Sequence, residues 1–338
     1  MQTLQFHRLE IQHLHIEDDS TCLAALSAAT PISETTREHA RLRAVGLVKA
    51  IRADSNPGLM EVFLAEYGLS TDEGVALMCL AEALLRVPDS YTMDALIEDK
   101  IAPSSWGAHL GKSSSSLVNA STWALMLTGK VLKDDEGAGI AATLHGAIKR
   151  LGEPVIRTAV NRAIREMGHQ FVLGRTINEA VSRGRKLARQ GFTFSYDMLG
   201  EAALTADDAR KYFDAYSAAI EELAAQCKSG DIRENPGISV KLSALHPRYE
   251  VGQKDRVMRE LVGTARKLAR QARKAGMGFN IDAEEADRLD LSLDVIEALL
   301  RDPDLAGWDG FGVVVQAYGK RAGQVLDWLH ALSVQLDR

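Results

Sequence analysis

Four times in the second half of the chain, a short apolar run is followed by an amphipathic stretch of helix length. The apolar runs are FTFSYD, GISVKL, GFNID and FGVVVQAY, and the stretches that follow them begin at Thr205, Lys254, Leu291 and Ala322. Strands that alternate with helices are typical of a parallel sheet, because parallel neighbours need a crossover that a helix usually provides. The pattern therefore predicts four successive βα units in an α/β fold.

Each predicted strand ends in a polar or charged residue. These residues are Asp197, Lys241, Asp282 and Gln316, at intervals of 44, 41 and 34 residues, which suit one strand, one helix and two loops. In a (β/α)8 barrel the carboxyl ends of the strands form the active-site face. We therefore expect the four side chains to converge on one rim, as in the first four βα units of such a TIM-type barrel.

The third strand raises a question of its own, because GFNIDAEEADRL runs straight into a cluster of acids. One interpretation is that the acids begin a helix and lie in water. The other is that the strand aims a carboxylate at a substrate. The polar ends of the other three strands favour the second interpretation for Asp282, whereas Glu284, Glu285 and Asp287 are expected in the following loop or first helical turn.

The first 150 residues are predicted to be entirely helical. ETTREHARLRAVGLVKAIRAD has apolar residues at helical spacing, and STDEGVALMCLAEALLRV begins with a capping box formed by Ser70 and Glu73. The sequence therefore predicts a helical arm over residues 1–55, a helical domain with a linker over 56–150, and the barrel portion over 151–338.

Composition narrows the function classes. The net charge of -6 gives no support for broad nucleic-acid binding, and no run approaches the roughly 18 apolar residues of a membrane span. Cys22, Cys79 and Cys227 form neither a metal spacing nor a disulfide framework, and His13 and His15 have no further ligands nearby. The first residues lack the pattern of a signal peptide. We expect a cytoplasmic protein without a metal site or nucleic-acid partner, and peripheral membrane contact stays open.

Lys241 lies in an apolar strand and needs a partner, because an unpaired buried charge is costly. Asp282, one strand further along, is the expected partner. The pair could hold Lys241 ready for a substrate carboxylate, or it could be a structural salt bridge at the rim. A lysine at a barrel strand end could also form a Schiff base with a carbonyl substrate, as in an aldolase-type lyase.

Gln316 follows three valines at the end of the fourth predicted strand. Its amide offers both a donor and an acceptor, which can match the edge of a flavin ring or of a base. The alternative is a hydrogen bond to the backbone at the barrel rim.

Longer motifs carry a family resemblance. FSYDMLGEAALT, GISVKLSALHPRYE, NIDAEEADRLDLSLD and GWDGFGVVVQAYGKR occur in this order between residue 152 and the end of the sequence. They closely resemble the proline dehydrogenase domain of the bacterial bifunctional proline utilization A family. The helical first 150 residues resemble the N-terminal arm and α-domain of the same family, through weaker motifs.

The resemblance implies a (β/α)8 barrel that binds FAD at its carboxyl-end rim. It implies oxidation of L-proline to Δ1-pyrroline-5-carboxylate in proline catabolism, with electrons passed to a membrane quinone. By motif, Lys241 resembles the lysine that holds the proline carboxylate, Asp282 the aspartate beside it, and Asp197 a further site aspartate. Gln316 resembles the amide that hydrogen-bonds the isoalloxazine, and Glu201 the acid of a loop that closes over substrate.

The sequence also departs from the family pattern. No basic strand–helix–helix segment is seen, so a repressor role is not predicted. The barrel is expected to be truncated after the fourth unit, to lack the later arginine motifs and the aldehyde dehydrogenase domain, and to be inactive unless a partner supplies the missing half. Two alternatives stay open: a Schiff-base lyase that uses Lys241, and a non-catalytic assembly fragment that self-associates, as a homo-oligomer, through its sheet edge. Peripheral binding at the inner membrane is the expected location of an enzyme that reduces a quinone.

Overall fold

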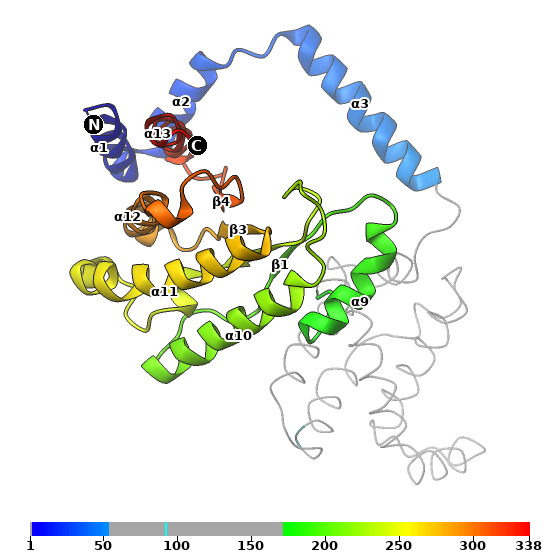
Figure 1. The fold of residues 1–338 in the computed structure, drawn as a ribbon. Helices are drawn as coiled ribbons and strands as arrows, with labels where there is room; N and C mark the ends of the chain where they lie inside the picture. The colour runs from blue at the N-terminus through cyan, green and yellow to red at the C-terminus, as the bar shows by residue number, and fades with distance from the viewer. Residues whose placement is uncertain (1, 54–91, 93–171) are drawn as a thin grey trace, which may run out of the picture. The chain divides into compact units, whose positions relative to one another are not determined.

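The computed structural model describes residues 2–53, 92 and 172–338 (Figure 1). The chain divides into two compact units, one of residues 1–32 with 174–338 and the other of residues 33–173. In the described part of the second unit lies helix α3 (Glu34–Ala53). The helices predicted between residues 54 and 171 lie outside the described residues, and the predicted domain boundaries stay a prediction.

The first unit contains the four predicted βα units. The strands are β1 (Ser195–Asp197), β2 (Gly237–Val240), β3 (Gly278–Ile281) and β4 (Phe311–Val313). The helices that follow them are α10 (Ala206–Ala224), α11 (Lys254–Ala275), α12 (Leu289–Leu300) and α13 (Ala322–Leu336), and α9 (Ile177–Ala188) precedes β1. All neighbouring strands are parallel, and they lie in chain order β1-β2-β3-β4. The α/β prediction is therefore confirmed.

Short 3-10 turns complete the connections between these elements. They are η2 (Leu242–Ala244), η3 (Val251–Gln253), η4 (Ala286–Arg288) and η5 (Pro303–Leu305).

Buried apolar residues alternate with polar residues along β2 and β3, so the two faces of the sheet differ in polarity. Ile238 and Val240 of β2 and Phe279 and Ile281 of β3 are fully buried in a core shared with the helices. Helix α11 contributes Leu261 and other apolar residues spaced at helical intervals. Because successive side chains of a strand point to opposite faces, the intervening residues face the other side. Those residues include Ser239 and Asn280, and they are polar.

The helices begin and end where local chemistry dictates. Thr205 and Asp208 form a reciprocal capping box at the start of α10. Gly276 ends α11 in the left-handed conformation, with a φ of 71° that disfavours residues carrying a Cβ. Helix α13 covers the segment AGQVLDWLHALSVQL that the sequence predicted.

All four strands are shorter in the structure than in the sequence pattern, and β2 and β3 end one residue before Lys241 and Asp282. β1 begins at Ser195 rather than at the first residue of FTFSYD, and β4 ends at Val313, so that Gln316 lies three residues beyond its strand. Pairing between β3 and β4 reaches as far as the Val314 N–H, which donates to the Ile281 carbonyl at 3.0 Å. The prediction that Gln316 terminates a strand is therefore wrong.

The N-terminal helices were predicted correctly as helices. α1 (Gln2–Ile16) packs along α13, and α2 (Asp19–Ala29) follows it. Arg8 of α1 donates to Asp294 at 2.7 Å, and its guanidinium lies 5.5 Å from the ring centre of Trp328. These contacts tie α1 to α12 through Asp294 and to α13 through Trp328. Among the helices that the structure describes, none is long and apolar enough to cross a bilayer.

Candidate functional site

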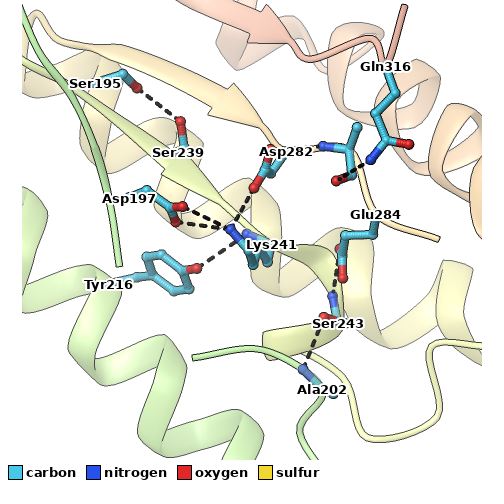
Figure 2. Close-up of polar contacts among 11 residues, drawn as sticks. Ser195, Asp197, Ala202, Tyr216, Ser239, Lys241, Ser243, Asp282, Glu284 and Gln316 are labelled. Atoms are coloured by element: carbon cyan, nitrogen blue, oxygen red, sulfur yellow. Dashed lines mark hydrogen bonds and ion pairs between the residues drawn. The ribbon is translucent and has the colours of Figure 1, made fainter. Parts of the chain in front are cut away.

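The ends of the first three strands bring three predicted site residues together. Lys241 Nζ lies 3.0 Å from both carboxylate oxygens of Asp197 and 2.5 Å from Asp282 Oδ2. Figure 2 shows the three side chains pointing toward one another. The Lys241 side chain is 14% exposed, Asp282 is 23% exposed and Asp197 is 46% exposed. The predicted Lys241–Asp282 pair is present, with Asp197 as a second carboxylate partner.

Strand register explains why these residues meet. Val240 pairs with Ile281, so the next residue of each strand, Lys241 and Asp282, lies at the same level of the sheet. Asp197 pairs with Ser239, two positions before Lys241, and reaches Lys241 from the β1 side. Because the sheet is parallel, all three residues fall at its carboxyl edge. Chain order and register therefore bring together residues that are 41 and 44 positions apart.

The charge state of Lys241 follows from its two partners. Burial alone would lower the pKa of Lys241, but the hydrogen bonds that its ammonium donates to Asp282 and Asp197 outweigh this effect and raise the pKa above the ordinary lysine value. The backbone N–H of Lys241 also donates to the Tyr216 hydroxyl at 3.2 Å. Burial raises the pKa of Tyr216 to about 12, so this phenol stays neutral. The site is a fixed cation held between two carboxylates.

A polar layer lies below this cluster on the same face of the sheet. Ser195 and Ser239 share a hydrogen bond of 2.9 Å, and Asn280 Nδ2 donates to Ser195 Oγ at 3.0 Å. Gly312 of β4 makes room for Asn280, because a Cβ added at Gly312 would overlap Asn280 Oδ1. The face that carries Lys241 is therefore polar for at least two layers.

Gln316 lies apart from the charged cluster. Its Nε2 donates to the Ala283 carbonyl at 3.4 Å (Figure 2). Its Oε1 accepts from the Tyr318 hydroxyl at 3.4 Å. Both contacts are long, and Gln316 is exposed. The amide is therefore free to exchange these contacts for a ligand that offers a donor and an acceptor.

Glu201 is not part of the charged cluster. It lies in the loop between β1 and α10 and is exposed. Within the described residues no ion pair includes it. Its predicted role in closing over a substrate stays a prediction.

Sequence reasoning missed two residues at this rim. Ser243 is buried, and its N–H donates to Glu284 Oε1 at 3.1 Å. Burial raises the pKa of the Glu284 carboxyl, and the hydrogen bond from Ser243 opposes this effect. The signal for both residues is their position, since each follows a cluster residue, Lys241 or Asp282, by two. The expectation that Glu284 follows the strand in a loop is confirmed, but its carboxylate bonds to protein.

No group of three or more His, Cys, Asp or Glu residues within the described ranges could hold a metal ion. The site chemistry there consists of one ammonium, carboxylates, a phenol and amides. Such groups can bind a zwitterion, since they offer both charge signs within a few ångströms.

Two family models match the chain. One described as Proline dehydrogenase matches residues 180–338, which include every strand and the whole charged cluster. One described as DNA-binding domain of Proline dehydrogenase matches residues 59–171. Those residues lie outside the described part except for Thr92, so the expected absence of a nucleic-acid partner stays a prediction.

Curated relatives are similar over most of this chain. Bifunctional protein PutA of Escherichia coli (strain K12) is 49% identical over 308 residues, which is 91% of this chain and 23% of the relative. Bifunctional protein PutA of Rhizobium meliloti is 50% identical over 311 residues, 92% of this chain and 25% of the relative. The chain thus spans about a quarter of the length of these relatives.

A solved structure shares the fold. Proline Utilization A (PutA) of Bradyrhizobium japonicum, in a variant form, is 47% identical with a TM-score of 0.62 over 95% of this chain and 32% of that one. The four parallel strands and their helices fit part of the TIM-like barrel predicted from the sequence.

Proposed function

The chain belongs to the proline dehydrogenase family, and from this membership we propose that its strand-end site takes part in the FAD-dependent oxidation of L-proline to Δ1-pyrroline-5-carboxylate. The observation that carries the proposal is Lys241, held as a cation between Asp197 and Asp282 at the carboxyl edge of the sheet. The family match and this geometry concern the same residues.

The charges of the cluster suit an amino acid substrate. Proline carries a carboxylate and a ring ammonium, which need a cation and anions respectively. Lys241 has three N–H donors, and its contacts to Asp197 and Asp282 occupy them. Asp197 is the more exposed partner and the more distant one. A substrate carboxylate therefore displaces Asp197 from Lys241, while Asp282 continues to orient the lysine.

The rim also offers groups that fit a flavin. The exposed amide of Gln316 can pair with the donor and acceptor edge of the ring, and the polar face below can accept a polar ligand. When bound, a flavin supplies the acceptor for the hydride that leaves the proline ring. The chain's own residues position the substrate: Lys241 orients its carboxylate, and Asp282 and Asp197 attract its ammonium. These carboxylates are also near enough to receive the nitrogen proton lost on oxidation.

The wider setting is part of the proposal. In the complete protein, electrons pass to a membrane quinone, and an aldehyde dehydrogenase domain acts on the product. Support comes from the relatives, which are named bifunctional proteins and are about four times as long as this chain. A cytoplasmic location with peripheral contact at the inner membrane follows from the same proposal.

The charge state of Lys241 argues against the Schiff-base lyase. A lysine nucleophile must be neutral, and such lysines usually have a lowered pKa. Here two carboxylates raise the pKa of Lys241. Borohydride treatment with a carbonyl substrate should leave Lys241 unmodified, and a covalent adduct on this residue would restore the lyase hypothesis.

The test of the main proposal is the visible absorbance spectrum of the purified chain after FAD addition and desalting. Retained flavin absorbance that is bleached by L-proline supports it, and the Lys241→Met variant should retain flavin without bleaching. A colourless protein contradicts flavin binding by this chain alone, and the expectation that the chain is inactive without a partner for the other half of the barrel stays a prediction. The assembly-fragment alternative predicts oligomers in light scattering, so a compact monomer would count against that alternative.

A further inference from the structure

The loop between β1 and α10, residues 198–204, has an unusual backbone. Gly200 has a φ of 129°, and Ala202 has a φ of 54°, in the left-handed region that residues with a Cβ rarely adopt. A side chain at Gly200 would collide with the ring of Tyr212. The loop carries Glu201 between these two positions. Such a conformation persists only where the surroundings impose it.

The loop has little apolar packing of its own to impose that conformation. Leu199 is 77% exposed and Leu204 is 84% exposed, whereas Met198, at the start of the loop, packs partly buried against the core. Its buried residue is Ala203, at 5% exposure. Beyond these two contacts, the loop backbone is held by hydrogen bonds.

Ser243 supplies those hydrogen bonds. The N–H of Ala202 donates to Ser243 Oγ at 3.0 Å, and the N–H of Ala203 donates to the Ser243 carbonyl at 2.9 Å. Ser243 is 3% exposed, so water cannot easily replace it. One buried serine thus holds two consecutive backbone donors next to Glu201.

Ser243 is itself held by the next strand-end segment. Its N–H donates to Glu284 Oε1 at 3.1 Å. The segments after β1, β2 and β3 are therefore linked in series by Ala202, Ser243 and Glu284, as Figure 2 shows. This chain of bonds runs beside the charged cluster, because Lys241 precedes Ser243 by two residues and Asp282 precedes Glu284 by two.

We infer that Ser243, supported by Glu284, is a positioning residue that anchors the β1–α10 loop and so sets where Glu201 stands relative to the Lys241 cluster. The inference rests on the proposed function in one respect, that the loop borders a substrate site. Within the described residues, the Ser243 side chain bonds to neither carboxylate of the cluster, Asp197 or Asp282. It acts through the backbone of the loop.

The first test is hydrogen exchange on the 338-residue chain with the Ser243→Ala variant, which removes Oγ and keeps the carbonyl. We expect the Ala202 amide to exchange about ten times faster, because a net hydrogen bond is worth on the order of one factor of ten. Strands β2 and β3 should keep their protection. Ser239→Ala is the matched control, since it removes a hydroxyl of the preceding strand β2 that bonds Ser195 and not the loop.

Unchanged exchange at Ala202 in Ser243→Ala would overturn the inference, and so would an equal increase in every strand. Should Ser243→Ala fail to fold, the pair Glu284→Ala and Glu284→Gln replaces it. The alanine variant removes the acceptor of the Ser243 N–H, whereas the glutamine variant retains one. Only Glu284→Ala should release the loop, and equal exchange in the two variants would contradict the anchor.

The second test separates positioning from general stability. In the chain loaded with FAD, Ser243→Ala should raise KM for proline about ten-fold and leave the flavin spectrum unchanged, whereas Ser217→Ala, which removes a hydroxyl that bonds Gln271 between α10 and α11, should change KM less than about two-fold. Exchange needs no turnover, so faster Ala202 exchange in a chain that does not oxidise proline would refute the proposed function alone. Turnover with an unaltered KM and unaltered exchange would refute the anchor alone.

Discussion

The two faces of the four-stranded sheet are made by adjacent residues and have opposite properties. Toward the helices, Ile238, Val240, Phe279 and Ile281 are fully buried. On the other face, Ser239, Lys241, Asn280 and Asp282 bond to one another and to neighbouring polar groups. Along one strand, residues that stabilise the fold therefore alternate with residues that form the site. Stability and function should be separable by substitutions only one residue apart.

The largest expected change is a loss of stability from a substitution at Phe279, on the helix-facing side of the sheet. Phe279→Ala should lower the free energy of unfolding by about 3–5 kcal/mol, because a fully buried ring leaves a cavity. Denaturant unfolding followed by circular dichroism measures the change. Ser239→Ala, on the other face, should cost about 1 kcal/mol or less. Equal losses in the two variants would mean that the faces are not separable.

The second-largest expected change is a loss of proline oxidation activity from a substitution on the polar face. Lys241→Met should lower kcat/KM for proline about 100-fold, roughly 3 kcal/mol, because the substrate carboxylate loses its cation. Steady-state oxidation of proline by the FAD-loaded chain measures it. Lys186→Met, at an exposed position of α9, serves as the control and should change kcat/KM less than about two-fold. A similar loss in both variants would remove Lys241 from the site.

A smaller effect is expected where β4 passes the polar layer. Gly312→Ala should destabilise the protein by about 1–3 kcal/mol, because the new Cβ displaces Asn280. The same change at Gly263, inside α11 with open space around it, should stabilise by about 0.5–1 kcal/mol. Thermal unfolding of the two variants tests the contrast in sign. Two shifts of the same sign would contradict this account of Gly312.

The smallest effect is a pH dependence from Glu284. Burial raises its pKa in the folded state, so the folded chain binds more protons than the unfolded chain between the ordinary pKa of about 4.3 and the raised value. The contribution of Glu284 to stability therefore falls as pH rises through that window. Unfolding curves of Glu284→Gln should show a shallower fall than those of the parent chain. Identical pH profiles would mean that burial of this carboxyl has no energetic consequence.

Much of this arrangement could be predicted from residues alone. Apolar runs alternating with amphipathic stretches predicted the four parallel strands, and the polar strand ends predicted that Asp197, Lys241 and Asp282 would meet. Both are consequences of chain order and strand direction. The end of β4 was not predictable from the valines before Gln316, because a strand ends where its pairing ends, and the bonds to β3 reach only the Val314 N–H, which donates to the Ile281 carbonyl.

The loop anchor was not predictable for a different physical reason. The bonds that Ser243 accepts come from backbone N–H groups, which every residue except proline carries, so the sequence does not mark which ones are used. The positive φ of Ala202 was equally unpredictable, since alanine seldom adopts the left-handed conformation. Only the shared two-residue offset from Lys241 and Asp282 pointed to Ser243 and Glu284.

The packing of α1 along α13 has a consequence for the order of events during synthesis. Lys320 binds the Glu17 carbonyl across 303 residues of sequence, and Ile11 of α1 is fully buried in the finished fold. At ribosomal rates of about 5–20 residues per second, α1 waits roughly 15 to 60 s before its partner helix is made. During that interval its apolar side chains have no permanent cover. Helix α1 therefore leaves the ribosome well before the helix that covers it, which leaves it open to chaperones that act on nascent chains.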